Sequence, residues 1–316
     1  MKQNFALQYY LWLAISLVFL ASCEKPFIDD SESGNRKENE NKGKVQTITF
    51  NANSIEQLSF SDGNELQSPS YSRGSVSLSD VCKRLSFAVF DESGVRVGKT
   101  IYTASTDKNF GQVSVSLSEG TYTFVFIADN GAGNPTITSP KKITFKDNKV
   151  TDTFYYCGDL TIDDGSESEY DVELKRAVAM FRLVVSDATP KDIKQMKFYY
   201  TGGSSTFDAT TGYGCVNSTQ TEYRNVVSDA YEGSSSYDVY TFPHEDGKPL
   251  QMKISALAGQ SATAAVKYVR TIDNVPVEKN VITRYSGYFY GESPEGGRSF
   301  GITIEDGRWE ENDYEY

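Results

Sequence analysis

From residue 45 onward, apolar and polar residues alternate with a period of two in many short runs. Residues 45–50 (VQTITF) and 112–117 (QVSVSL) show the alternation clearly. Successive side chains of a strand point to opposite faces, so this pattern predicts strands with one buried face. Runs bounded by Gly, Asn, Asp and Ser predict further strands at residues 85–90, 95–103, 121–128, 150–156, 172–186, 196–201, 237–242, 250–258, 264–271, 281–291 and 300–305.

Few segments have the apolar spacing of an amphipathic helix. Residues 177–185 satisfy it in part, but their branched and aromatic side chains also suit a strand, and we favour the strand. The Ser-Glu-Gly step at residues 118–120 predicts a hairpin turn between the strands on either side. Residues 202–236 are rich in Gly, Ser, Thr and Asn, which predicts a long loop with little regular structure.

The spacing of the strands also indicates the architecture. Many short strands about ten residues apart are typical of β-sandwiches. The chain has 316 residues, enough for two such domains. Residues 159–171 (DLTIDDGSESEYD) are acidic and contain Ser and Gly, as a domain junction would. We therefore predict an all-β chain with an N-terminal β-sandwich at residues 45–165 and a C-terminal one at 166–316.

The N-terminal segment carries an export signal. Residues 11–21 (LWLAISLVFLA) form an apolar run of signal-peptide length, and Lys2 is the only charged residue before residue 24. The following Leu20-Ala21-Ser22-Cys23 resembles the lipobox of bacterial lipoproteins, in which the Cys is acylated and becomes the new N-terminus. This predicts a signal peptide at residues 1–22 and a lipid on Cys23, whose several acyl chains give stable anchoring.

Two other interpretations of this segment are a plain signal peptide and a transmembrane anchor. The uncharged residues 3–22 are only just long enough to cross a bilayer, which takes about 20 residues. A polar tract follows Cys23 at once, and residues 23–44 hold too few apolar side chains to fold, which predicts a flexible tether. Asp29 and Asp30 resemble a surface-export signal of Gram-negative lipoproteins. We expect a lipid-anchored protein on the outside of the outer membrane.

Charge excludes some partners. The formal net charge is −12, so the surface repels phosphate backbones and nucleic-acid binding is not expected. The same charge opposes docking on anionic lipid through a basic patch. The aromatic content of 13%, with 21 Tyr, favours sheet.

The four cysteines do not form a metal motif. They are Cys23, Cys82, Cys157 and Cys215, and the single histidine, His244, has none of them at zinc-ligand spacing. If Cys23 carries lipid, the remaining three cannot all pair. Cys82 and Cys157 lie in one predicted domain and could form a disulfide in an oxidising compartment; the alternative is three buried free thiols.

No motif singles out an enzyme. A G-x-S-x-G elbow is missing, and Gly131-Ala132-Gly133 is not part of a complete dinucleotide-binding fingerprint. Ile162 occupies a ligand position between Asp159 and Asp164, which breaks the EF-hand spacing. A glycosidase carboxylate pair stays open among the 43 acidic residues, but none stands out. We predict no catalysis, no catalytic residues, no cofactor and no bound metal.

Three segments carry a family resemblance. They are residues 119–125 (EGTYTFV), 174–181 (LKRAVAMF) and 275–290, which include Lys279-Asn280 and Tyr285-Ser286-Gly287-Tyr288-Phe289-Tyr290. With Trp309 and the lipobox, their order resembles the fimbrillin superfamily, the type V pilus lipoproteins, and within it the anchor and accessory branch. Plainer roles for the same residues are Arg176 as a surface charge on an edge strand and Gly120 as a turn residue.

The resemblance implies transthyretin-like sandwiches that assemble by strand exchange. A protease cuts a pilin after a basic residue and removes its first strand, and the C-terminal strand of a neighbour fills the groove. An anchor keeps its first strand and its lipid. Here residues 45–50 are the candidate first strand, and Arg73 in residues 68–75 is the candidate cleavage position, unless it is an ordinary loop arginine.

The C-terminal end differs from that of a stalk pilin. Residues 310–316 (EENDYEY) are acidic and lack alternation, so only residues 299–309 suit a donor strand, unless they belong to the chain's own fold. We predict a structural subunit of a surface fimbria, an anchor or an accessory or tip protein, with other fimbrial subunits as partners. The alternative is a surface glycan-binding lipoprotein whose exposed Tyr or Trp side chains stack on sugars; a hydrolase is a third hypothesis.

Overall fold

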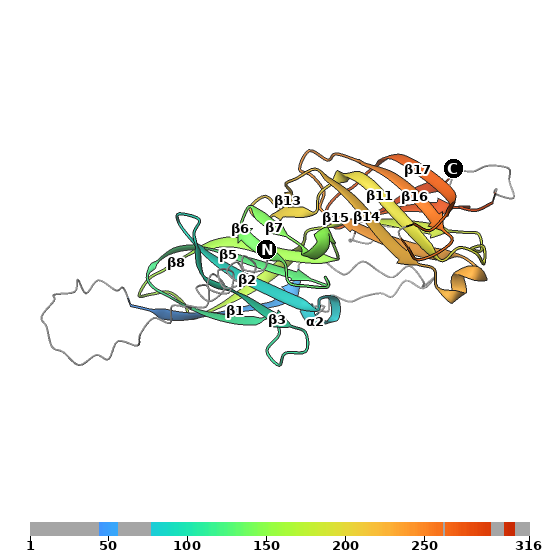
Figure 1. The fold of residues 1–316 in the computed structure, drawn as a ribbon. Helices are drawn as coiled ribbons and strands as arrows, with labels where there is room; N and C mark the ends of the chain where they lie inside the picture. The colour runs from blue at the N-terminus through green and yellow to red at the C-terminus, as the bar shows by residue number, and fades with distance from the viewer. Residues whose placement is uncertain (1–43, 56–76, 262, 292–299, 307–316) are drawn as a thin grey trace, which may run out of the picture. The chain divides into compact units, whose positions relative to one another are not determined.

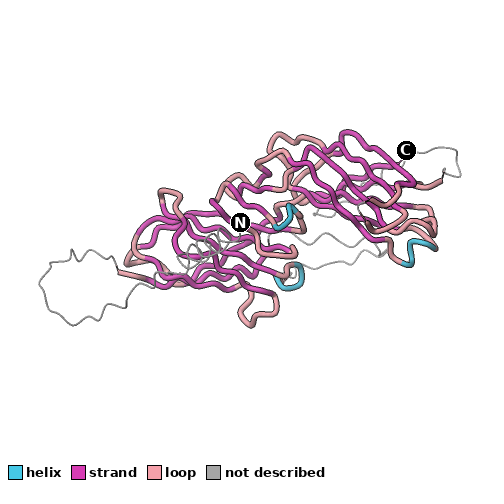
Figure 2. Tube along the Cα trace, in the orientation of Figure 1, coloured by secondary structure: helices cyan, strands magenta, loops and turns pink. Residues whose placement is uncertain are grey.

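The computed structural model describes residues 44–55, 77–261, 263–291 and 300–306. The described residues all belong to one compact unit. Strands dominate it, and helix within the described residues is confined to short segments (Figures 1 and 2). These are α2 (Leu78–Val81) and the 3-10 turns η2 (Lys146–Asn148) and η3 (Ser228–Tyr231). The predicted all-β sandwich fold is confirmed.

The first half of the chain forms a seven-stranded sheet that folds over into two layers. Its strands are β1 (Gln46–Ile55), β2 (Arg84–Asp91), β3 (Arg96–Ala104), β4 (Gln112–Leu117), β5 (Gly120–Asp129), β8 (Thr153–Ile162) and β9 (Glu169–Arg176). Their order is β3-β2-β5-β8-β9-β1-β4. Strands β8 and β9 pair at only two positions, Phe154↔Arg176 and Tyr155↔Lys175, so β9-β1-β4 separates from β3-β2-β5-β8 and packs against it.

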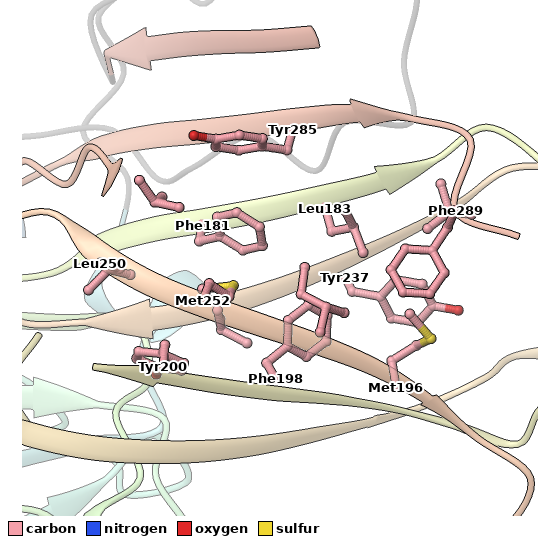
Figure 3. Packing of buried hydrophobic residues seen from close by; sticks show 14 of the residues in the cluster. Phe181, Leu183, Met196, Phe198, Tyr200, Tyr237, Leu250, Met252, Tyr285 and Phe289 are labelled. Atoms are coloured by element: carbon pink, nitrogen blue, oxygen red, sulfur yellow. The ribbon is translucent and has the colours of Figure 1, made fainter. Parts of the chain in front are cut away.

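The second half is a sandwich of two four-stranded sheets. One has the order β15-β10-β18-β19 and the other β14-β11-β16-β17. Figure 3 shows Phe181 and Tyr285 of the first sheet pointing toward Phe198 of the second, and the rings of Phe181 and Phe198 lie 6.3 Å apart. The strands are β10 (Ala179–Val185), β11 (Gln195–Gly203), β14 (Ser218–Asn225), β15 (Ser235–Thr241), β16 (Leu250–Leu257), β17 (Val266–Val275), β18 (Val281–Gly287) and β19 (Phe300–Asp306).

A third sheet joins the two halves. Its strands are β6 (Thr136–Ser139), β7 (Lys142–Thr144), β12 (Thr206–Asp208) and β13 (Tyr213–Gly214), in the order β13-β12-β7-β6. Phe207 of β12 pairs with Ile143 of β7, and its ring lies 4.9 Å from that of Phe242. This cluster covers the second face of β2 and β5, which explains why these strands read as nearly continuous apolar runs.

The loop predicted for residues 202–236 is wrong. That segment holds β12, β13, β14 and η3. The short strands β12 and β13 have weak local signals, and β12 is held by pairing with β7, which lies far away in the sequence. Small residues are used there because the backbones approach closely, and a Cβ on Gly202 would lie 2.3 Å from the carbonyl oxygen of Pro249.

The predicted hairpin at residues 118–120 is also wrong. Strand β4 pairs with β1, whereas β5 pairs with β2 and β8, so the connection crosses between layers. Likewise, residues 172–186 are two strands, β9 and β10, separated at Ala177-Val178. Of the acidic residues 159–171, the first four end β8, the last three begin β9, and only 163–168 connect the two strands within the first sheet. The domain boundary after residue 165 stays a prediction, and β9 beyond it pairs with β1 and β8.

All three described cysteines are free thiols. Cys82 is buried in the core between the layers of the first half, whereas Cys157 packs against the cluster on the opposite face of β5 and β8. Of the two states left open by the sequence, the structure has the free thiols, but only Cys82 is buried, because Cys157 is half-buried and Cys215 is exposed.

Candidate assembly site

The candidate first strand is an inner strand of its layer. Strand β1 runs antiparallel to β4, from Gln46↔Leu117 to Asn51↔Gln112. On its other side it runs parallel to β9, where Thr49 is opposite Glu169. The strand predicted at residues 45–50 is found as β1, which begins at Gln46 and continues to Ile55. Hydrogen bonding on both edges makes β1 an integral part of the first sandwich.

One face of β1 is buried between the two layers. Ile48, Phe50 and Ala52 are at most 3% exposed. The Phe50 ring centroid lies 4.7 Å from that of Phe124 and 5.6 Å from that of Phe87. Burial of one such ring contributes ~1.5–3 kcal/mol, so this face holds β1 in place through the hydrophobic effect.

The other face of β1 is polar. Thr47 Oγ1 lies 3.0 Å from Ser116 Oγ, and the Gln112 amide donates to Asn51 Oδ1 over 3.0 Å. Loss of β1 would leave the edges of β4 and β9 unpaired and open a slot ~33 Å long, lined by aromatic rings on its inner side. A strand with alternating apolar residues fits such a slot.

Both sequence-predicted site residues, Cys23 and Arg73, lie outside the described residues. The segment that carries Arg73 connects β1 to α2. The chain re-enters the described structure at Ser77, whose backbone N–H donates to Asp80 Oδ2 over 3.2 Å. The next residue, Leu78, is buried in the same core as Phe50. The two ends of this connection are therefore fixed in one core.

The C-terminal strand belongs to the second sandwich. Strand β19 pairs with β18 from Val281↔Asp306 to Gly287↔Phe300 and forms the edge of its sheet. Of the two interpretations of residues 299–309, the structure shows residues 300–306 as part of the chain's own fold.

The structure brings two of the family-like segments together at Arg176. The guanidinium is 1% exposed and pairs with both oxygens of Asp152, with Nε–Oδ1 at 2.8 Å and Nη2–Oδ2 at 2.9 Å. Its Nη1 donates to Asn280 Oδ1 over 2.7 Å, and the group lies 4.6 Å from the centre of the Phe154 ring. The interpretation of Arg176 as a surface charge is wrong.

The segment around Asn280 is held by backbone contacts as well. Asn280 has a φ of 61°, and its N–H donates to the carbonyl of Val178 over 2.8 Å. At the end of the same motif, the Asp187 carboxylate accepts 2.8 Å hydrogen bonds from the N–H groups of Phe289, Tyr290 and Gly291. Sequence reasoning missed Asp152 and Asp187, since nothing local distinguishes them from other surface carboxylates.

Within the described residues, no three His, Cys, Asp or Glu side chains gather as a metal-binding group. No helix among those residues has the length and apolarity needed to traverse a bilayer.

The fold is thus a double β-sandwich in which β1 is an inner strand and β19 pairs with β18 of its own sheet. A family model described as "Fimbrillin-A associated anchor proteins Mfa1 and Mfa2" matches residues 57–306. The chain belongs to this family, and membership in a fimbrial family implies a location at the cell surface. No curated protein matches the chain.

Solved structures of low identity are similar over most of the chain. A proposed adhesin of Bacteroides thetaiotaomicron is 14% identical with a TM-score of 0.48, and the match covers 83% of this chain and 96% of that one. The fimbrial anchor protein Mfa2 of Porphyromonas gingivalis is 13% identical with a TM-score of 0.42, covering 83% and 96%. The tip fimbrial protein Mfa3 of the same organism is 11% identical with a TM-score of 0.39, covering 83% and 100%.

Proposed function

We propose that this chain is a structural subunit of a cell-surface fimbria, held in the outer membrane by lipid on Cys23. It acts as the anchor, or as an accessory or tip protein, and joins other fimbrial subunits by β-strand complementation. Family membership and the lipobox-like residues 20–23 support this proposal.

The observation that carries the proposal is the position of β1. Its apolar face fills the space that an incoming donor strand would occupy, and it pairs with β4 and β9 along its length. A subunit whose slot is filled by its own covalently attached strand accepts no neighbour there. If β1 stays attached after export, the polymer ends at this subunit, as an anchor requires.

The subunit joins its neighbour by giving a strand. Strand β19 is the candidate, because it lies at a sheet edge and pairs with β18 alone. If β19 moves into the slot of another subunit, it gives up its backbone hydrogen bonds to β18 and forms new ones with the strands that border the slot. The acidic residues 310–316 would then lie at the end of the donated segment.

The anchor role is tested by Cys23→Ala in cells that produce fimbriae, with Cys215→Ala as a control at an exposed cysteine. We expect Cys23→Ala to release intact fimbriae into the medium and Cys215→Ala to leave them attached. If the Cys23→Ala subunit is released into the medium while the fimbriae stay attached to the cells, the chain is not the anchor. If the wild-type subunit never co-purifies with fimbriae, the whole proposal is wrong.

A deletion of residues 299–316 tests strand donation. We expect the truncated subunit to reach the membrane and to lose its association with the neighbouring fimbrial subunit. Association that survives the deletion would exclude β19 as the exchanged strand.

A further inference from the structure

The outer face of the sheet β14-β11-β16-β17 carries two exposed tyrosines. Tyr199 on β11 is 41% exposed and Tyr223 on β14 is 37% exposed. The neighbours of Tyr199 in the chain, Phe198 and Tyr200, are fully buried, so the tyrosine points away from the core. Neither the sandwich core nor the proposed strand exchange uses these two rings.

Strand register places lysines between and beside the tyrosines. Tyr223 is opposite Lys197, whereas Tyr199 is opposite Thr221 on one side and Lys253 on the other. The tyrosines are thus diagonal neighbours, ~7–8 Å apart. Lys197 Nζ lies 6.0 Å from the centre of the Tyr223 ring. We call this set of four residues, Tyr199, Tyr223, Lys197 and Lys253, the tyrosine–lysine face.

A shallow pocket of about 250 Å³, lined mainly by residues with polar side chains, continues this face. Thr201, two residues after Tyr199, and Gln251, two residues before Lys253, pair with each other and line it. Lys248 Nζ, also at the pocket, donates to Asn217 Oδ1 over 3.1 Å. The volume is below the ~300–1,000 Å³ of typical small-molecule sites, which suits one ring of a longer ligand that also lies on the open face.

The local charge is opposite to that of the chain. The formal net charge is −12, yet the outward positions of this sheet carry Lys197 and Lys253, with the exposed Asp273 of β17 as a carboxylate beside them. Lys248 adds a third cation at the pocket. An anionic ligand is attracted here and repelled by most of the remaining surface.

We infer that the tyrosine–lysine face and its pocket bind an acidic carbohydrate. The C–H face of a sugar ring packs on the negative face of a tyrosine ring, and the lysines neutralise its carboxylate or sulfate groups. The Thr, Gln and Asn side chains of the pocket supply both donors and acceptors for hydroxyl groups. A protein partner fits less well, because the core of a protein interface is depleted in charge, whereas lysines flank both tyrosines here.

Carbohydrate binding at this face requires neither the lipid nor strand exchange, so it can be tested separately from both. The full chain is titrated by calorimetry with hyaluronan, oligogalacturonate and heparin oligosaccharides, and with neutral maltohexaose. We expect at least one acidic oligosaccharide to bind and maltohexaose not to bind. Tyr199→Ala and Tyr223→Ala should each weaken binding by about three- to tenfold, the value of one aromatic contact.

Matched controls come from the first sandwich. Tyr102 on β3 is 42% exposed, and Tyr102→Ala should leave the affinity unchanged. Lys253→Gln should weaken acidic oligosaccharides and flatten the salt dependence, whereas Lys99→Gln, at an exposed lysine on β3, should not. Unchanged melting temperatures would show that the variants fold.

Three results overturn the inference. They are no binding by any of the acidic oligosaccharides, binding that both tyrosine variants retain, and equal binding of maltohexaose. If a purified fimbrial subunit binds this face instead and loses affinity in the tyrosine variants, the face is a protein interface and the carbohydrate assignment is wrong.

Discussion

The guanidinium of Arg176 donates a 2.7 Å hydrogen bond to the side-chain oxygen of Asn280, a residue 104 positions further along the chain. Arg176 ends β9 of the first sheet, and Asn280 directly precedes β18 of the second sandwich. With Asp152 as the counter-charge, the contact ties together the ends of strands from both halves. Two segments that resemble fimbrillin motifs therefore have a shared structural role.

Replacing Arg176 tests that role. Arg176→Met should lower the free energy of unfolding by about 3–5 kcal/mol, because it leaves Asp152 unpaired in a largely buried setting. Urea denaturation measures the change. Lys44→Met is the control, since the Lys44–Asp164 pair is about 70% exposed at both ends and its loss should not change stability measurably. Equal effects of the two substitutions would contradict a structural role for the buried pair.

The aromatic face of β1 gives a second prediction. Phe50→Ala should cost about 3–5 kcal/mol, because it leaves a cavity beside Phe87 and Phe124. Limited proteolysis should then cut within β1 faster than in the wild type. Thr49→Ala, on the polar face, removes only a hydroxyl contact with Ser114 and serves as the control. An undisturbed β1 in Phe50→Ala would show that burial of this ring does not hold the strand.

Asp129 predicts a pH dependence. Its side chain is fully buried, and burial raises the pKa of the carboxyl above its usual value of 3.8, against the lowering effects of the Gly131 N–H and Arg84. The folded state therefore binds a proton on Asp129 more tightly than the unfolded state, so the contribution of this carboxyl to stability is greatest below pH 3.8 and is lost as the pH rises through its folded-state pKa. Asp129→Asn should gain stability relative to wild type between pH 4 and 7.

The measurement for Asp129 is a series of urea denaturations from pH 3.5 to 7. The control is Asp164→Asn at an exposed carboxylate, which should follow the wild-type curve. The opposite result would be an Asp129→Asn protein that is less stable than wild type, with a larger deficit at pH 7 than at pH 4. It would mean that the favourable contact of Asp129 with Arg84 outweighs the cost of burying the charged carboxylate.

The free thiols give a fourth prediction. In a Cys23→Ala chain, a colorimetric thiol reagent at pH 8 should react quickly with exposed Cys215 alone. Burial raises the pKa of Cys157 to about 11 and that of Cys82 even further, so both stay protonated, and neither is exposed as Cys215 is. Unfolding in denaturant should release all three thiols. One thiol after unfolding would indicate a disulfide between Cys82 and Cys157.

The sequence predicts the fold class because the signal is local. In residues 45–50 and 112–117, alternation alone identifies the strands and their buried faces, and both are found as β1 and β4. The same signal carries no information on partners. The turn at residues 118–120 therefore suggested a hairpin, although β4 pairs with β1 rather than with β5.

The remaining errors share that cause. Strands β12 and β13 are too short to show alternation, and β12 is stabilised by β7 from the other half. Arg176 reads as a surface residue because a charged side chain is seldom buried without a partner, and its partner Asp152 is not marked in the sequence. The lipid on Cys23 and cleavage at Arg73 rest on residues outside the described structure and stay predictions.

The most direct test of an anchor that keeps its first strand is the intact mass of the native protein extracted from outer membranes with detergent. We predict one species that begins at Cys23, carries acyl chains and includes β1. A species that begins after Arg73, or one whose Cys23 is unmodified, would contradict the proposed function.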